Sequence, residues 1–101
     1  AEVFSFDTRV AVVPGADTSP TSVMAARFQE WQRQHRLKGP QTNLTFTEVV
    51  SAFSGGKTLR VVSETLRRVV EFRKILEWLV AQGLLVQMAT FYHFFPARAD
   101  A

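Results

Sequence analysis

Residues 51–58, SAFSGGKT, end in the Gly-Lys-Thr triplet that also ends a phosphate-binding P-loop. A P-loop has the pattern G-x-x-x-x-G-K-S/T, in which backbone N–H groups and the lysine surround the phosphates of a nucleotide. In this chain Ser51 stands where the first glycine belongs. A P-loop must also follow a strand, whereas the residues before Gly55 have a helical pattern. We therefore expect Lys57 to bind no phosphate.

The other residues that could support catalysis are few. There are two histidines, His35 at the polar end of a predicted helix and His93 among aromatic residues. The nine acidic residues are scattered, without the spacing of a metal-binding loop, and there is no cysteine to hold zinc or form a disulfide. No nucleophile, base and orienting group can be assembled. The sequence thus predicts no enzyme, cofactor, metal site or small-molecule substrate.

Local signals predict where the first two helices begin. Ser19 followed by Pro20 is typical of a helix start, because proline fits the first helical position. Thr45 and Glu48 have the spacing of a capping box, in which each side chain bonds a free backbone N–H of the other residue. Gly55, with the glycine after it, predicts the end of this second helix.

The remaining segments predict a further helix or helix pair and a β element. Residues 59–83 have helical spacing, with a break expected near Ser63. Residues 84–95 are aromatic and β-rich, and we expect one strand that ends at Pro96. At the other end, residues 3–6 and 10–13 are short apolar runs that predict a β-hairpin.

These elements predict an α+β fold, a small winged-helix-like domain with three to four helices and a three-stranded β element. Residues 1–96 would form this single domain, and residues 97–101 a disordered tail. The chain begins with Ala1 instead of Met, so we expect it to be part of a longer protein. No run of about 18 apolar residues is present, so no membrane span is expected. The expected core contains Trp31, Phe46, Val50, Phe53, Phe72, Leu76 and Leu79.

Two binding functions fit such a domain. A winged helix can bind DNA, and five basic residues lie near the expected recognition helix. Acidic residues alternate with them, however, and the net charge is only +3 at a pI near 10.0. The candidate DNA contacts are Arg60, Arg67, Arg68, Arg73 and Lys74.

Protein interaction is the favoured function, because the last strand is apolar on both faces. If this strand is regular, Met88 and Phe94 share one face, and Phe91 and Phe95 share the other. We expect Phe91 and Phe95 to contact a partner.

A longer segment resembles a known family. Residues 75–95, ILEWLVAQGLLVQMATFYHFF, are similar to the helix and strand of nitrogen permease regulator 3-like proteins. In that family a tryptophan-containing helix runs into a strand with leucines, glutamine, threonine and tyrosine. Phe91 stands where the family has the tyrosine. Residues 3–28 and 43–53 also resemble the hairpin, the Ser-Pro helix start and the short helix of that family.

The resemblance implies a non-catalytic scaffold that follows a longin-like domain. Family members pair with a nitrogen permease regulator 2-like subunit and a DEP-domain subunit in a GATOR/SEA-type complex. That complex acts on Rag GTPases and restrains TOR signalling when amino acids are scarce. The implied location is cytoplasmic, at the lysosomal or vacuolar surface through the complex. The family's catalytic arginine belongs to the partner subunit, so the resemblance assigns no catalytic residue here.

Overall fold

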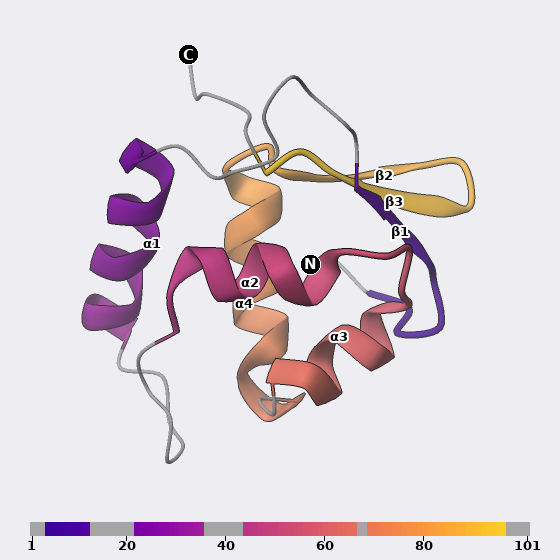
Figure 1. The fold of residues 1–101 in the computed structure, drawn as a ribbon, viewed down its shortest axis with the longest axis horizontal. Coiled ribbons are helices and arrows are strands. Elements are labelled where there is room, and N and C mark those ends of the chain that lie inside the picture. Colours follow the sequence, from indigo (N-terminus) through magenta and orange to yellow (C-terminus); the bar gives the residue numbers. More distant parts are fainter. Residues whose placement is uncertain (1–3, 13–21, 36–43, 67–68, 97–101) are drawn as a thin grey trace.

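The computed structural model describes residues 4–12, 22–35, 44–66 and 69–96. Four helices and three strands follow one another in these ranges (Figure 1). The predicted tail 97–101, and the helix start at Ser19-Pro20, lie outside the described residues. The elements are β1 (Val10–Val12), α1 (Ser22–His35), α2 (Phe46–Phe53), α3 (Leu59–Leu66), α4 (Val69–Ala81), β2 (Leu85–Met88) and β3 (Phe91–Phe94).

The second half of the chain has the element order of a winged helix. Helices α2, α3 and α4 are followed directly by the β2–β3 hairpin, which takes the place of the wing. Helix α1 precedes this unit and packs against α2. The predicted α+β fold with three to four helices and a three-stranded β element is therefore confirmed, and the element order is consistent with the winged-helix-like prediction.

The three strands form one mixed sheet in the order β1-β3-β2. Strand β1 is parallel to β3, with Val10 opposite Tyr92, and β2 is antiparallel to β3. The predicted hairpin near the N-terminus is wrong, because residues 4–8 form no strand and Thr8 instead donates to Ser5 O in a turn (3.1 Å). An apolar strand in the middle of a sheet needs a neighbour on each side, and β1 supplies the second neighbour of β3.

The predicted single strand over residues 84–95 is also wrong. It is a hairpin, and its two-residue turn consists of Ala89 and Thr90. Ala89 has φ 56°, the left-handed conformation that such turns need at their first position and that glycine usually supplies. Neither turn residue is a typical turn former, so no local pattern predicts the reversal.

Helix α2 begins as its sequence predicts. Glu48 N–H donates to Thr45 Oγ1 (3.1 Å), and Thr45 N–H donates to Glu48 Oε1 (2.9 Å), which completes the capping box. Gly55 and Gly56 follow the helix with positive φ angles of 94° and 64°, as expected for a glycine stop. The expected break near Ser63 lies elsewhere, because α3 continues to Leu66.

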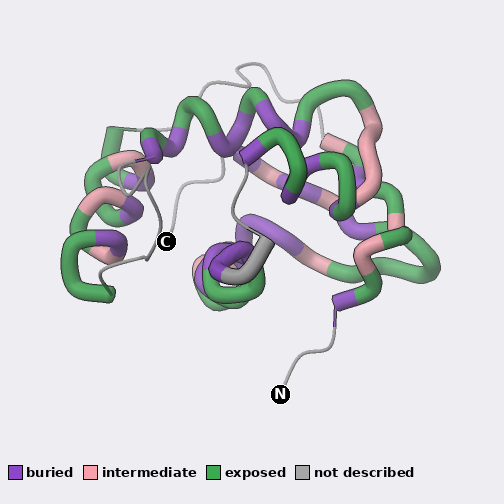
Figure 2. Tube along the Cα trace, turned by 90° about the horizontal axis from the view of Figure 1, so that it is seen from below, coloured by how far each residue is buried: buried purple, intermediate pink, exposed green. Residues whose placement is uncertain are grey.

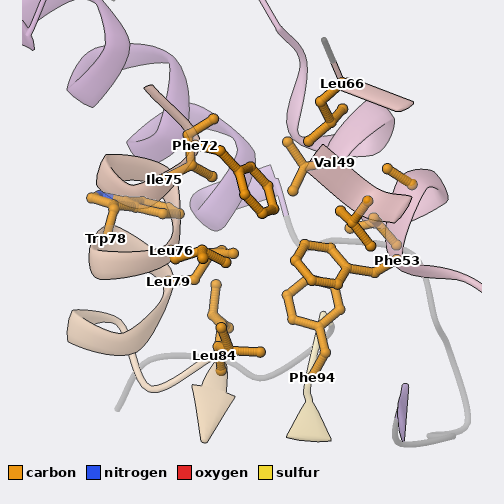
Figure 3. Packing of buried hydrophobic residues seen from close by; sticks show 14 of the residues in the cluster. Val49, Phe53, Leu66, Phe72, Ile75, Leu76, Trp78, Leu79, Leu84 and Phe94 are labelled. Carbon is orange, nitrogen blue, oxygen red and sulfur yellow. The ribbon is translucent and has the colours of Figure 1, made fainter. Parts of the chain in front are cut away.

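One hydrophobic core joins the helices to the sheet. Buried residues lie on the inward sides of the elements (Figure 2), and Phe72, Leu76 and Leu79 of α4 point toward Phe53 and Phe94 (Figure 3). The rings of Phe53 and Phe94 are stacked at 4.5 Å. The residues predicted for the core belong to this cluster, except Trp31, which is partly buried and packs against it.

Helix α1 is attached to the core by a polar clamp as well as by aromatic contacts. Gln32 is buried, its Nε2 donates to Leu44 O (2.6 Å), and its Oε1 accepts from Leu44 N–H (3.0 Å). This pair satisfies both backbone groups of Leu44 just before α2. Phe28 meanwhile packs on Trp78 of α4 at 5.3 Å. The clamp and the ring contact together fix α1 beside α2 and α4.

Replacing Leu76 with Ala should lower the free energy of unfolding by about 2–5 kcal/mol, because the side chain is fully buried and would leave a cavity. Denaturant unfolding measures this change. Val61→Ala on α3, where the side chain is 42% exposed, is the control and should cost less than about 0.5 kcal/mol. Equal effects of the two substitutions would contradict the assignment of Leu76 to the core.

Ala89→Gly should stabilise the domain by about 0.5 kcal/mol. Glycine removes the strain of about 1–2 kcal/mol that a left-handed alanine carries. Part of this gain is lost because glycine has greater conformational freedom in the unfolded chain. Ala26→Gly, at an exposed position inside α1, is the matched control and should destabilise by about 0.5–1 kcal/mol. Thermal or urea unfolding of both variants checks the opposite signs, and destabilisation by Ala89→Gly would contradict the turn geometry.

Candidate functional site

The SAFSGGKT segment lies between two helices. Residues 51–53 end α2, and α3 starts at Leu59. The first N–H groups of α3 are already bonded: Leu59 N–H donates to Thr8 O (3.1 Å) and Arg60 N–H donates to Phe6 O (2.7 Å). Val61 N–H donates to Thr58 Oγ1 (3.3 Å). A phosphate site at a helix start requires such groups to be free, so this helix start does not supply one.

The two histidines lie on different elements, His35 at the end of α1 and His93 on β3. His35 Nδ1 is 2.9 Å from Trp31 O, and its ring packs on that tryptophan at 5.0 Å. His93 lies on β3, half-buried, and its Nδ1 has no hydrogen-bond partner. Within the described ranges, no three His, Asp or Glu residues are grouped so that they could hold a metal ion.

The basic residues predicted for DNA contact are spread over α3 and α4. Arg60 is exposed and pairs with Asp7 (3.2 Å), while the guanidinium of Arg73 lies 5.0 Å from the ring centroid of Phe6. Lys74 is exposed on α4, and Arg67 and Arg68 lie outside the described residues. The N-terminal segment therefore engages two of the three candidates that the structure describes.

A shallow groove of about 320 Å³ lies between α2 and α3. Most of its lining is hydroxyl-bearing or apolar, and its one carboxylate, that of Glu48, is used in the capping box. The groove thus offers no unengaged charged group to a ligand. It is lined by Thr47, Glu48, Ser51, Ala52, Thr65 and Leu66.

The sheet has one face on the core and one face turned outward. Val10, Leu85, Tyr92 and Phe94 are buried on the core face. Because side chains alternate along a strand, the residues between them lie on the outer face. This outer face consists of Ala11, Val86, Met88, Phe91 and His93.

Met88 and Phe91 are the most exposed apolar pair on the outer face. They are register partners beside the hairpin turn, and their exposed fractions are 49% and 46%. Directly opposite residues in an antiparallel pair lie on the same face. The expectation that Met88 shares a face with Phe94 is therefore wrong, because the turn at Ala89 and Thr90 reverses the chain.

The two predicted contact residues differ in exposure. Phe91 and Phe95 fall on the same side of the strand by alternation, as expected. Phe95 is half-buried, however, and its N–H donates to Leu84 O (2.8 Å) at the base of the hairpin. Sequence reasoning missed Met88 as the neighbour of Phe91. Recognition of the turn was the one signal that could have found it.

Comparisons with known proteins add no relative. No family model matches the chain, and it matches no curated protein and no solved structure. None of the described helices is long and apolar enough to cross a membrane.

Adding ATP or GTP with magnesium should leave the melting temperature of the domain unchanged, because the N–H groups at the start of α3 are already bonded. Thermal shift of the unaltered chain and of Lys57→Ala measures this. A saturable stabilisation that disappears in Lys57→Ala would overturn the conclusion, whereas equal curves for both proteins agree with it.

Proposed function

We propose that this domain is a non-catalytic interaction module that packs the outer face of its sheet against a partner protein. The observation that carries the proposal is the exposed pair Met88 and Phe91. Aromatic residues and methionine are enriched in protein interfaces, and charged residues are depleted from the interface core. The hairpin, residues 84–95, has no Lys, Arg, Asp or Glu.

The size of this pair indicates an anchor within a larger contact. Burying the exposed half of each side chain would contribute about 1 kcal/mol per residue. Stable protein interfaces bury about 800 Å² on each partner, far more than two half-exposed side chains supply. The pair would therefore be the centre of an interface whose remaining area comes from the surrounding surface of the domain.

The same observations favour protein over DNA as the partner. A wing that contacts DNA needs basic residues to meet the phosphates, and this hairpin has none. Arg60 and Arg73 are held by Asp7 and Phe6. Among the described candidates, only Lys74 is not held by the N-terminal segment. One cation provides little phosphate affinity.

The resemblance to nitrogen permease regulator 3-like proteins supplies the identity of the proposed partners. We propose that the domain belongs to a subunit of a GATOR/SEA-type complex, with a nitrogen permease regulator 2-like subunit and a DEP-domain subunit. It would contribute to restraint of TOR signalling through Rag GTPases without contacting them directly. The proposed location is the cytoplasmic surface of the lysosome or vacuole.

Phe91→Ser should weaken binding to the co-expressed nitrogen permease regulator 2-like subunit by about tenfold, as expected for the loss of an aromatic anchor. Titration calorimetry measures the affinity, and circular dichroism checks that the variant is folded. Val61→Ser, which changes a similarly exposed apolar residue on α3, is the control and should bind normally. Loss of binding in Val61→Ser but not in Phe91→Ser would place the interface on the helices instead.

A further inference from the structure

One charged side chain lies beside the exposed apolar pair. The register that places Val10 opposite Tyr92 also brings Arg9 level with Phe91, and Tyr92 N–H donates to Arg9 O (3.0 Å). Since Val10 points into the core, Arg9 points to the outer face. Met88 of β2, Phe91 of β3 and Arg9, directly before β1, thus form a row at the end of the sheet near the hairpin turn.

The guanidinium of Arg9 is held in place but not neutralised. Its Nη1 donates to Gly56 O (2.6 Å), which fixes the side chain against the loop before α3. Arginine has five N–H donors, so four remain for a partner. In the described part of the chain no carboxylate pairs with Arg9, and the nearby Asp7 is engaged by Arg60 (3.2 Å). The row therefore combines two apolar side chains with one oriented positive charge.

We propose that the partner surface presents an Asp or Glu carboxylate to Arg9, beside an apolar site that receives Phe91 and Met88. This inference rests on the proposed protein-interaction function and adds the chemistry of the partner. A carboxylate fits the free donors of a guanidinium in a two-pronged arrangement, which gives direction as well as attraction. Arg9 would then set the register of docking, and Phe91 would supply apolar contact.

A second copy of this chain does not fit the row. Among the described residues, the outer face consists of apolar side chains, His93 and Arg9, so these residues of a copy packed face to face would offer no carboxylate. Its own Arg9 would instead add a like charge. An anionic lipid surface fits poorly as well, because polybasic membrane sites use clusters of about 4–8 Lys or Arg residues. The row has one.

The test measures affinity for the nitrogen permease regulator 2-like subunit over a range of salt concentrations. Arg9→Glu should weaken binding by about tenfold or more, since it replaces attraction with repulsion at the partner's carboxylate. Arg9→Gln should weaken binding less and should reduce the salt dependence. Arg9→Lys should restore part of the affinity. Phe91→Ser should weaken binding without changing the salt dependence, and Lys74→Glu on α4 is the matched charge control.

The outcomes separate the two proposals. Normal binding by Arg9→Glu together with weak binding by Phe91→Ser would contradict the proposed partner carboxylate at Arg9. The proposed apolar contact of Phe91 would still hold. Normal binding by Phe91→Ser, or no binding by the unaltered chain, would overturn the proposed function and this inference with it. The unaltered chain could instead bind phosphatidylserine vesicles but not phosphatidylcholine vesicles. If both Arg9→Gln and Phe91→Ser abolished that binding, the row would be a lipid-binding site, and the proposal of a carboxylate on a protein partner would be wrong.

Discussion

The position of strand β1 between β3 and the start of α3 is the constraint on which the rest of the domain depends. On one side, Arg9 O accepts from Tyr92 N–H; on the other, Val10 N–H donates to Lys57 O (2.9 Å). The residues just before β1 also accept the first N–H groups of α3. One short segment therefore completes the sheet, satisfies a helix start and buries Val10, so it stabilises parts of the chain that lie far apart in sequence.

The same placement decides which chemistry the domain can offer. Because Phe6 and Thr8 occupy the N–H groups at the start of α3, the Gly-Lys-Thr segment lacks free backbone donors for a phosphate. Because β1 is parallel to β3, Arg9 lies beside Phe91, and its guanidinium adds a fixed positive charge to the outer face. Among the described residues, the exposed groups beside this strand include Arg9, Met88 and Phe91.

Local signals in the sequence predict the helices well. The strand arrangement is harder to predict, because it depends on pairing between residues far apart in the sequence. The capping box at Thr45 and the stop at Gly55 depend on neighbouring residues, so they could be recognised directly. The parallel partner of β1 lies about 80 residues away, and no local pattern specifies it. The turn at Ala89 depends on a left-handed alanine, which sequence rules disfavour. The apolar strand pattern predicts Phe91 as a contact. Its neighbours Met88 and Arg9 are not predicted, because the turn at Ala89 places Met88 beside it and the parallel pairing of β1 places Arg9 beside it.

The central claim is that the outer face of the sheet, and not the helices, meets the partner. Cross-saturation NMR on the methyl groups of the domain, in complex with the unlabelled nitrogen permease regulator 2-like subunit, tests this most directly. We expect signal loss at Met88 and Val86, and unchanged signals at Val23 and Val61, which are exposed on α1 and α3. Signal loss at Val23 or Val61, with Met88 and Val86 unchanged, would contradict the account.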